Sequence, residues 1–177
     1  GLTGCAAAYA FAAAGHAVTL FEADRIGRTG SGRGSGWLTD EPPVTFAELD
    51  AALGRRAARH AFQAWRRAAL DAAALLRRLD VKCRLDSRAS LFVAQTPEQS
   101  VHLTRDQRSR KDAGLDTSMV PQRTVGGLTG FPLLAARRTR DSATLDPYRV
   151  TLGLAAAAVQ RGARLFERSP VTATSFT

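Results

Sequence analysis

The chain has 177 residues, of which 45% are hydrophobic and 23% charged, enough for one globular core with part of a second. Lys and Arg number 25 against 16 Asp and Glu, a formal net charge of +9. The arginines of 55–78 stand beside alanines, without the regular alternation of aromatic residues that a base-stacking surface needs. We therefore interpret the positive charge as solvated helix faces and predict no nucleic-acid partner.

Cysteine usage and hydropathy define the cellular setting that we expect. Cys5 and Cys83 are far apart and have no metal-ligand spacing, which predicts neither a disulfide framework nor a metal site. No run reaches the ~18 apolar residues of a membrane span, and the opening residues lack the basic flank of a signal peptide. We predict a cytoplasmic protein that does not bind membranes. The chain opens with Gly1 and its only methionine is Met119, so we expect a fragment of a longer protein.

The first 43 residues alternate helix, strand and loop signals. Residues 2–14 are alanine-rich, lack proline and end at Gly15, which is typical of a short helix. Residues 17–23, AVTLFEA, are typical of a strand buried on both faces of a parallel sheet. Together they predict a βαβ unit whose first strand is missing. The glycine cluster and Pro-Pro pair of 24–43 predict a long loop without helix or regular strand.

The rest of the chain predicts a second group of elements and a return to helix and strand. Residues 45–79 predict two helices with a break near Gly54, held by an apolar stripe. That stripe comprises Leu49, Leu53, Ala57, Phe62, Trp65, Leu70, Leu75 and Leu76. After it we expect a strand pair in 83–94, a helix from Thr96 to Gly114, two short strands, a helix from Asp146 to Gln160, and strands at 163–167 and 171–176.

Gly1, Gly4 and Glu22 form the most informative pattern. GLTG supplies the last two glycines of GxGxxG, which let the backbone approach a pyrophosphate and let the helix pack on the strand. Glu22 stands where an acid binds the ribose hydroxyls, which favours FAD or NAD over NADP. A bare GxxG equally indicates a simple glycine helix start, but the helix, Gly15 and the buried strand favour the dinucleotide reading.

The residues GLTGCAAAYAFAAAGHAVTLFEADRIG and the following TGSGRGSG resemble the opening of the D-amino-acid oxidase (DAO) family of FAD-dependent oxidoreductases, which includes glycine and sarcosine oxidases. RASLFVAQTPEQ, KDAGLD, LDPYRVTLGLAAAAVQRGARLFE and SPVTA resemble later parts of that family in the same order. The resemblance implies an α/β fold: a Rossmann-like FAD-binding domain, incomplete because its first strand is missing, with part of an inserted α+β substrate domain. The implied segments are 1–43 and 146–177 for the FAD domain and 44–145 for the insertion.

The resemblance also implies which residues contact FAD. Those against the pyrophosphate would be Gly1, Thr3 and Gly4, and those on the adenosine side would be Glu22, Ala23 and the backbone of Val171. The loop past the pyrophosphate, ribityl chain and flavin would be lined by Gly30, Ser31, Gly32, Arg33 and Gly36. Many relatives have a sequence closer to SGRNGG there, whereas this chain has Gly34 and Ser35 in place of the Asn-Gly pair. The resemblance therefore does not assign which side chain, if any, touches the flavin. A flexible glycine linker is the alternative reading of this loop.

The activity implied by the resemblance is oxidation of a small-molecule amine or amino acid by hydride transfer to flavin. No catalytic residue is assigned, because the family takes most substrate-anchoring residues from later strands, and we expect the fragment to be inactive alone. Two alternatives stand beside this one. An NAD-dependent dehydrogenase would continue as a simple βαβ alternation, whereas a long glycine loop and long helices follow Glu22. A non-catalytic basic binding module would need arginines clustered on one face.

Overall fold

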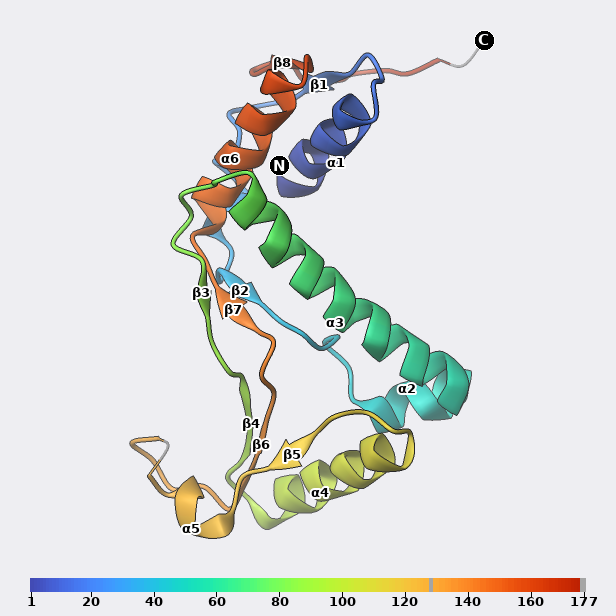
Figure 1. Cartoon of the computed structure of the whole chain (residues 1–177), viewed down its shortest axis with the longest axis vertical. Coiled ribbons are helices and arrows are strands. Elements are labelled where there is room, and N and C mark those ends of the chain that lie inside the picture. Colours follow the sequence, from blue (N-terminus) through green and yellow to red (C-terminus); the bar gives the residue numbers. More distant parts are fainter. Residues whose placement is uncertain (128, 176–177) are drawn as a thin grey trace. The chain divides into compact units, whose positions relative to one another are not determined.

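The structure is a computed structural model that describes residues 1–127 and 129–175 (Figure 1). The chain divides into two compact units, and each unit is built from separate stretches of sequence. Unit 1 contains residues 1–37, 73–86 and 144–177, and unit 2 contains residues 38–72 and 87–143. The chain changes unit once inside helix α3 (Arg55–Arg78), between Ala72 and Ala73, and also at three two-residue strands. These strands are β2 (Trp37–Leu38), β3 (Asp86–Ser87) and β7 (Ala143–Thr144), and they pair in the order β2-β7-β3.

Unit 1 contains a parallel strand pair with two helices. Strand β1 (Thr19–Phe21) pairs in parallel with β8 (Arg164–Phe166), and the helices are α1 (Leu2–Ala13) and α6 (Pro147–Gln160). Alanines let α1 and α6 pack closely, with Ala8, Ala12, Ala157 and Ala158 in one buried cluster. A parallel pair needs a crossover connection, here the whole chain between the two strands. This is the α/β arrangement that the sequence predicts, with the described part of the sheet limited to two strands.

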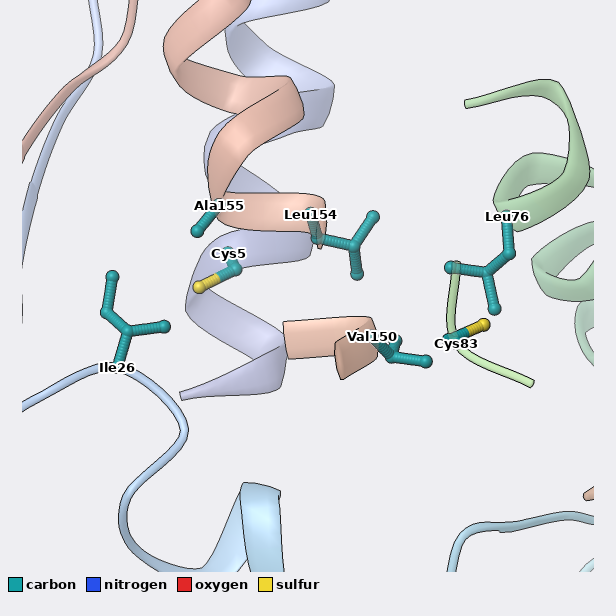
Figure 2. Packing of buried hydrophobic residues seen from close by; sticks show 7 residues of the cluster. All are labelled: Cys5, Ile26, Leu76, Cys83, Val150, Leu154 and Ala155. Atoms are coloured by element: carbon teal, nitrogen blue, oxygen red, sulfur yellow. The ribbon is translucent and has the colours of Figure 1, made fainter. Parts of the chain in front are cut away.

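A second buried cluster of unit 1 joins both helices to the end of α3 (Arg55–Arg78) and the turn that follows it. Cys5 and Cys83 are both fully buried there as free thiols. Figure 2 shows the seven residues of this cluster, Cys5, Ile26, Leu76, Cys83, Val150, Leu154 and Ala155. Both cysteines therefore act as small apolar side chains in this core.

Local capping signals set the helix ends in both units. The Thr45 side chain accepts the Glu48 N–H to begin α2 (Phe46–Leu53), and Thr96 accepts the Gln99 N–H to begin α4 (Pro97–Asp112). The side chain of Asp146 accepts the Arg149 N–H at the start of α6. Gly54, with φ +82°, separates α2 from α3, so the predicted break is confirmed.

Unit 2 is built on a three-stranded antiparallel sheet with helices beside it. The strand order is β4 (Leu91–Ala94), β6 (Ala135–Arg138) and β5 (Ser118–Met119), with β6 in the middle. Helix α4 lies beside this sheet, and the one-turn helix α5 (Gln122–Val125) follows β5 (Figure 1). A core of Phe46, Ala58, Phe62 and Ala113 joins α2, α3 and the end of α4.

Several predicted elements differ from the structure. The loop 24–43 contains a 3₁₀ helix, η1 (Gly30–Arg33), and strand β2, so the prediction of a loop without helix or strand is wrong. The predicted strand pair of 83–94 is also wrong as a pair, because β3 and β4 belong to different sheets. Residues 171–175 form no strand, and Phe176 lies outside the described residues.

The predicted apolar stripe of α2 and α3 is only partly correct. Phe62 and Leu76 are buried, but Leu53 is 62% exposed, and Ala57, Trp65 and Leu70 are exposed as well. The buried side of α3 consists of Ala58, Phe62, Ala69, Ala73 and Leu76. Three of these five buried residues, Ala58, Ala69 and Ala73, are small side chains that the predicted stripe did not include.

Candidate cofactor site

The start of α1 and the end of β1 lie together in unit 1. The Gly1 nitrogen is 2.9 Å from Oε2 of Glu22, and the Asp24 N–H donates to Oε1 of Glu22 at 3.2 Å. The hydrogen bond from the Gly1 nitrogen, and then that from the Asp24 N–H, hold the pKa of the Glu22 carboxyl below its usual range. Glu22 is therefore ionised and sits beside the glycine start of the helix.

The first turn of α1 presents main-chain N–H groups without a cap of its own. Gly1 is the N-cap residue and has no side chain to accept them. The Leu2 N–H donates instead to Oγ of Ser31, at 2.9 Å. Within residues 1–127 and 129–175, nothing accepts a hydrogen bond from the N–H of Thr3 or Gly4. These two donors stand at the positive end of the helix dipole, a favourable position for an anion.

Two glycines of the opening pattern lie in close contact with side chains of other elements. A Cβ on Gly4 would lie 3.3 Å from Cδ1 of Leu20 on β1, so Gly4 allows the helix to approach the strand. A Cβ on Gly1 would lie 2.7 Å from Oγ of Ser31. Gly4 thus has the packing role that the third glycine of the fingerprint has, and Gly1 makes room for the Ser31 contact.

The glycine loop is tightly packed, which argues against a flexible linker. A Cβ on Gly32 would lie 1.7 Å from the carbonyl oxygen of Gly27. Gly36 has φ +71°, and a Cβ there would lie 2.2 Å from the carbonyl oxygen of Leu145. Around Gly30, by contrast, the Cβ position is open. Gly32 and Gly36 are therefore needed for the chain to pack on itself, whether or not a ligand is bound.

The other predicted contact residues lie along the edges of this region. Arg33 ends η1 and is exposed, and no acidic side chain in the described chain forms an ion pair with it. The segment before Val171 runs beside the end of β1, because the Ser169 N–H donates to the Glu22 carbonyl at 2.9 Å. Val171 itself is 64% exposed, and Ala23 is exposed too. The structure thus brings Glu22 and Ser31 to the start of α1, and Val171 lies two residues beyond the Ser169 contact.

The dinucleotide chemistry expected from the sequence fits these residues. An anion accepts hydrogen bonds from main-chain N–H groups at a helix start, and Thr3 and Gly4 leave two such groups open. Ser31 accepts from Leu2 and keeps its own hydroxyl proton to donate. The ionised Glu22 is an acceptor suited to hydroxyl groups such as those of a ribose.

A buried charge network in unit 2 was not found by reasoning from the sequence. Glu41 binds Arg137 through both carboxylate oxygens, at 2.6 and 2.8 Å, and also binds Arg110 at 2.8 Å. Nε of Arg110 donates to Asp106 at 2.6 Å, and Asp106 accepts the N–H of Phe46 at the start of α2. The two arginines are 3% and 1% exposed, so these charges are removed from water and compensate one another.

Aromatic rings and a second carboxylate extend this network. The guanidinium of Arg110 stacks 4.5 Å from the Phe62 ring centre, and that of Arg137 stacks 4.2 Å from the centre of Phe92. Asp40, the neighbour of Glu41, accepts from Ser142 and Thr139 at 2.5 and 2.8 Å. The only signal in the sequence is the i, i+4 spacing of Asp106 and Arg110, which is common on exposed helices.

A cavity of about 480 Å³ lies in unit 2 between α3, the end of α4 and the loop before β7. Its charged walls are largely paired, with Arg66 bonded to Asp141 at 2.5 Å and Arg110 bonded to Glu41. All the predicted cofactor residues belong to unit 1, so this cavity is not part of the candidate cofactor site.

In the described part of the chain, no three His, Cys, Asp or Glu residues gather as metal ligands would. Among those residues, no helix is both long and apolar enough to cross a membrane.

Comparison with known proteins agrees with this geometry. The DAO family, described as FAD dependent oxidoreductase, matches residues 1–176. No curated protein matches the chain. Similar solved structures include glycine oxidase from Bacillus cereus (18% identity, TM-score 0.72, 100% of this chain and 48% of that one). Glycine oxidase from Geobacillus kaustophilus is 20% identical, with a TM-score of 0.68 over 95% of this chain and 44% of that one.

A third similar structure is L-alpha-glycerophosphate oxidase from Mycoplasma pneumoniae with FAD bound (18% identity, TM-score 0.70, 97% of this chain and 44% of that one). At these identities the solved structures show the fold, and they confirm the predicted mixed α/β class. The chain spans less than half the length of each of these three proteins.

Proposed function

The chain belongs to the DAO family of FAD dependent oxidoreductases, and on this basis we propose that the protein binds FAD and oxidises an amine or amino acid at a carbon–nitrogen bond. The observation that supports the proposal best is the pair of open N–H groups at the start of α1, flanked by Ser31 and by ionised Glu22. The names of similar structures, which include glycine oxidases and an L-amino acid deaminase from Proteus vulgaris, favour an amino-group substrate.

The chain's residues would hold FAD as follows. The N–H groups of Thr3 and Gly4 and the hydroxyl of Ser31 would bind the pyrophosphate, while the carboxylate of Glu22 would accept from ribose hydroxyls. Arg33 would add positive charge beside the phosphates. FAD, when bound, supplies the hydride acceptor for the oxidation. The protein's part is to fix the cofactor and to orient the substrate carbon toward it.

We also propose the domain limits and the compartment. Segments 1–43 and 146–177 would carry the cofactor, with Ala23 and Val171 on its adenosine side, and 44–145 would belong to the substrate side. The remaining loop contacts would come from Gly30, Gly32 and Gly36, of which Gly32 and Gly36 act through their backbone because no side chain fits there. A reducing cytoplasm suits the two free, buried thiols.

The decisive experiment is the visible absorption spectrum of the protein produced from its complete gene. Flavin bands, release of FAD on denaturation and bleaching by an amine or amino acid under anaerobic conditions are the expected result. As matched variants, Glu22→Gln should weaken FAD binding, whereas exposed Glu98→Gln on α4 should leave it unchanged. A folded, colourless protein that does not take up added FAD would overturn the proposal and favour a basic binding module.

A further inference from the structure

Tyr148, in the first turn of α6, packs against the glycine loop of unit 1. A Cβ on Gly27 would lie 2.8 Å from Cδ2 of the Tyr148 ring, and a Cβ on Gly32 would lie 3.1 Å from the same atom. The edge of one ring therefore covers the loop at both glycines. These contacts are made by ring carbons, and the hydroxyl takes no part in them.

The start of α6 is a fixed support for this ring. Asp146 caps the helix with its side chain, and its N–H donates to the Cys83 carbonyl at 2.7 Å. The Leu145 N–H donates to the Gly36 carbonyl at 2.8 Å, which ties the far end of the loop to the same place. The glycine loop is thus held by the start of α6 at its end and by the Tyr148 ring farther back.

The part of the loop between the two ring contacts carries Ser31. Its Oγ accepts the Leu2 N–H at 2.9 Å, and the 3₁₀ helix η1 around it is closed by the Gly32 N–H, which donates to the Thr29 carbonyl at 3.1 Å. A glycine-rich segment loses much conformational freedom when it is ordered. Its Ser31 hydroxyl is therefore in place for a ligand only when contacts from outside the loop fix the segment.

We propose that Tyr148 is a positioning residue for the pyrophosphate of FAD. Its ring holds η1 so that the Ser31 hydroxyl stays at the start of α1, beside the open N–H groups of Thr3 and Gly4. A loop that is ordered before binding gives higher affinity, because the ordering cost is met on folding and not on binding. This inference rests on the proposed function and deepens it. Since Tyr148 acts through Ser31, its loss should affect ligands that carry phosphates and spare those that do not.

The test is isothermal titration calorimetry of the full-length, flavin-free protein with ADP and with adenosine, which differ only in the pyrophosphate. Tyr148→Ala should weaken ADP binding about 10-fold, the size of one hydrogen bond to a charged group, and leave adenosine binding unchanged. Tyr148→Phe should keep the ADP affinity, because the ring carbons make the contacts. Val159→Ala is the matched control. Val159 is 51% exposed near the other end of the same helix, and its replacement should change neither ligand.

A double-mutant cycle separates positioning from general stability. Ser31→Ala should also weaken ADP binding about 10-fold, and adding Tyr148→Ala to it should cost less than about 2-fold more, because the two residues act as one unit. A general loss of stability would weaken both ligands and would persist in the Ser31→Ala background. Tyr148→Leu, which keeps an apolar side chain without the flat ring, replaces Tyr148→Ala if that variant does not fold, and the same split between ADP and adenosine is expected.

Unchanged ADP affinity in Tyr148→Ala, equal weakening of ADP and adenosine, or additive effects with Ser31→Ala would overturn the inference. A protein that takes up FAD and whose Tyr148→Ala variant keeps full ADP affinity would refute the inference alone. A protein that binds ADP through Tyr148 but takes up no FAD would refute the proposed function alone. A protein that binds neither FAD nor ADP would refute both.

Discussion

Glu41 offers the sharpest test of the buried network, because a single carboxylate compensates two buried guanidinium groups. Glu41→Gln keeps the side-chain shape and removes the charge, which leaves Arg137 and Arg110 with only Asp106 as an ionised partner. Removing one member of a buried ion pair costs about 3–5 kcal/mol. The three side chains are only 2–10% exposed, so solvent screening reduces that figure little. We expect a loss of about 3 kcal/mol in the free energy of unfolding.

The assay is urea denaturation followed by far-UV circular dichroism, with hydrogen exchange to locate the change in unit 2. Glu98→Gln is the matched control, because its side chain is 85% exposed beside His102, and such exposed pairs are worth ~0–1 kcal/mol. A double-mutant cycle of Glu41→Ala with Arg137→Ala should give a coupling energy above ~0.5 kcal/mol. If Glu41→Gln costs no more than Glu98→Gln, the network does not stabilise unit 2 and our reasoning is wrong.

Three further predictions concern single positions. In the same urea titration, Gly32→Ala should lower the free energy of unfolding by about 1–3 kcal/mol or more, because the new Cβ meets a main-chain oxygen. Gly30→Ala is the control and should be near neutral, because the space around its Cβ position is open. Burial raises the pKa of the Cys5 thiol, so mass spectrometry should show slow alkylation in native protein and fast alkylation in urea. Hydrogen bonds from Thr45 lower the pKa of the Glu48 carboxyl. The capping box should therefore stabilise α2 fully above the ordinary glutamate pKa, and this stabilisation should be lost as the pH falls through the lowered pKa of Glu48. Hydrogen exchange of α2 should show this pH dependence in the native protein and lack it in Glu48→Gln.

The elements that the sequence predicted correctly are those set by local signals. Helix α1 follows from an alanine run closed by Gly15, and the break between α2 and α3 follows from Gly54. Thr96 and Asp146 act as the caps that their positions predicted. In each case the residues that decide the structure lie in one short stretch of the chain, so the local sequence contains the whole cause.

Features that depend on distant residues could not be predicted in this way. Glu41 meets Arg137 across 96 positions, and nothing near either residue distinguishes it from a solvated charge. In α3 the choice between Ala57 and Ala58 as the buried residue depends on what packs against the helix, and residue type does not reveal it. Among the candidate site residues, Gly1, Gly4 and Glu22 were predictable because one helix and one strand bring them together.

The order in which the strands of unit 1 are synthesised has a consequence for biogenesis. Thr19 pairs with Arg164, so β1 waits for 145 further residues before its partner leaves the ribosome. Unit 2 is complete at residue 143, earlier than that pairing. Loop closure over such a distance is slow compared with local helix formation. Until then the buried side of α1 and the Phe21 ring lack their final neighbours, so apolar surface that is later covered stays exposed on the nascent chain during this interval.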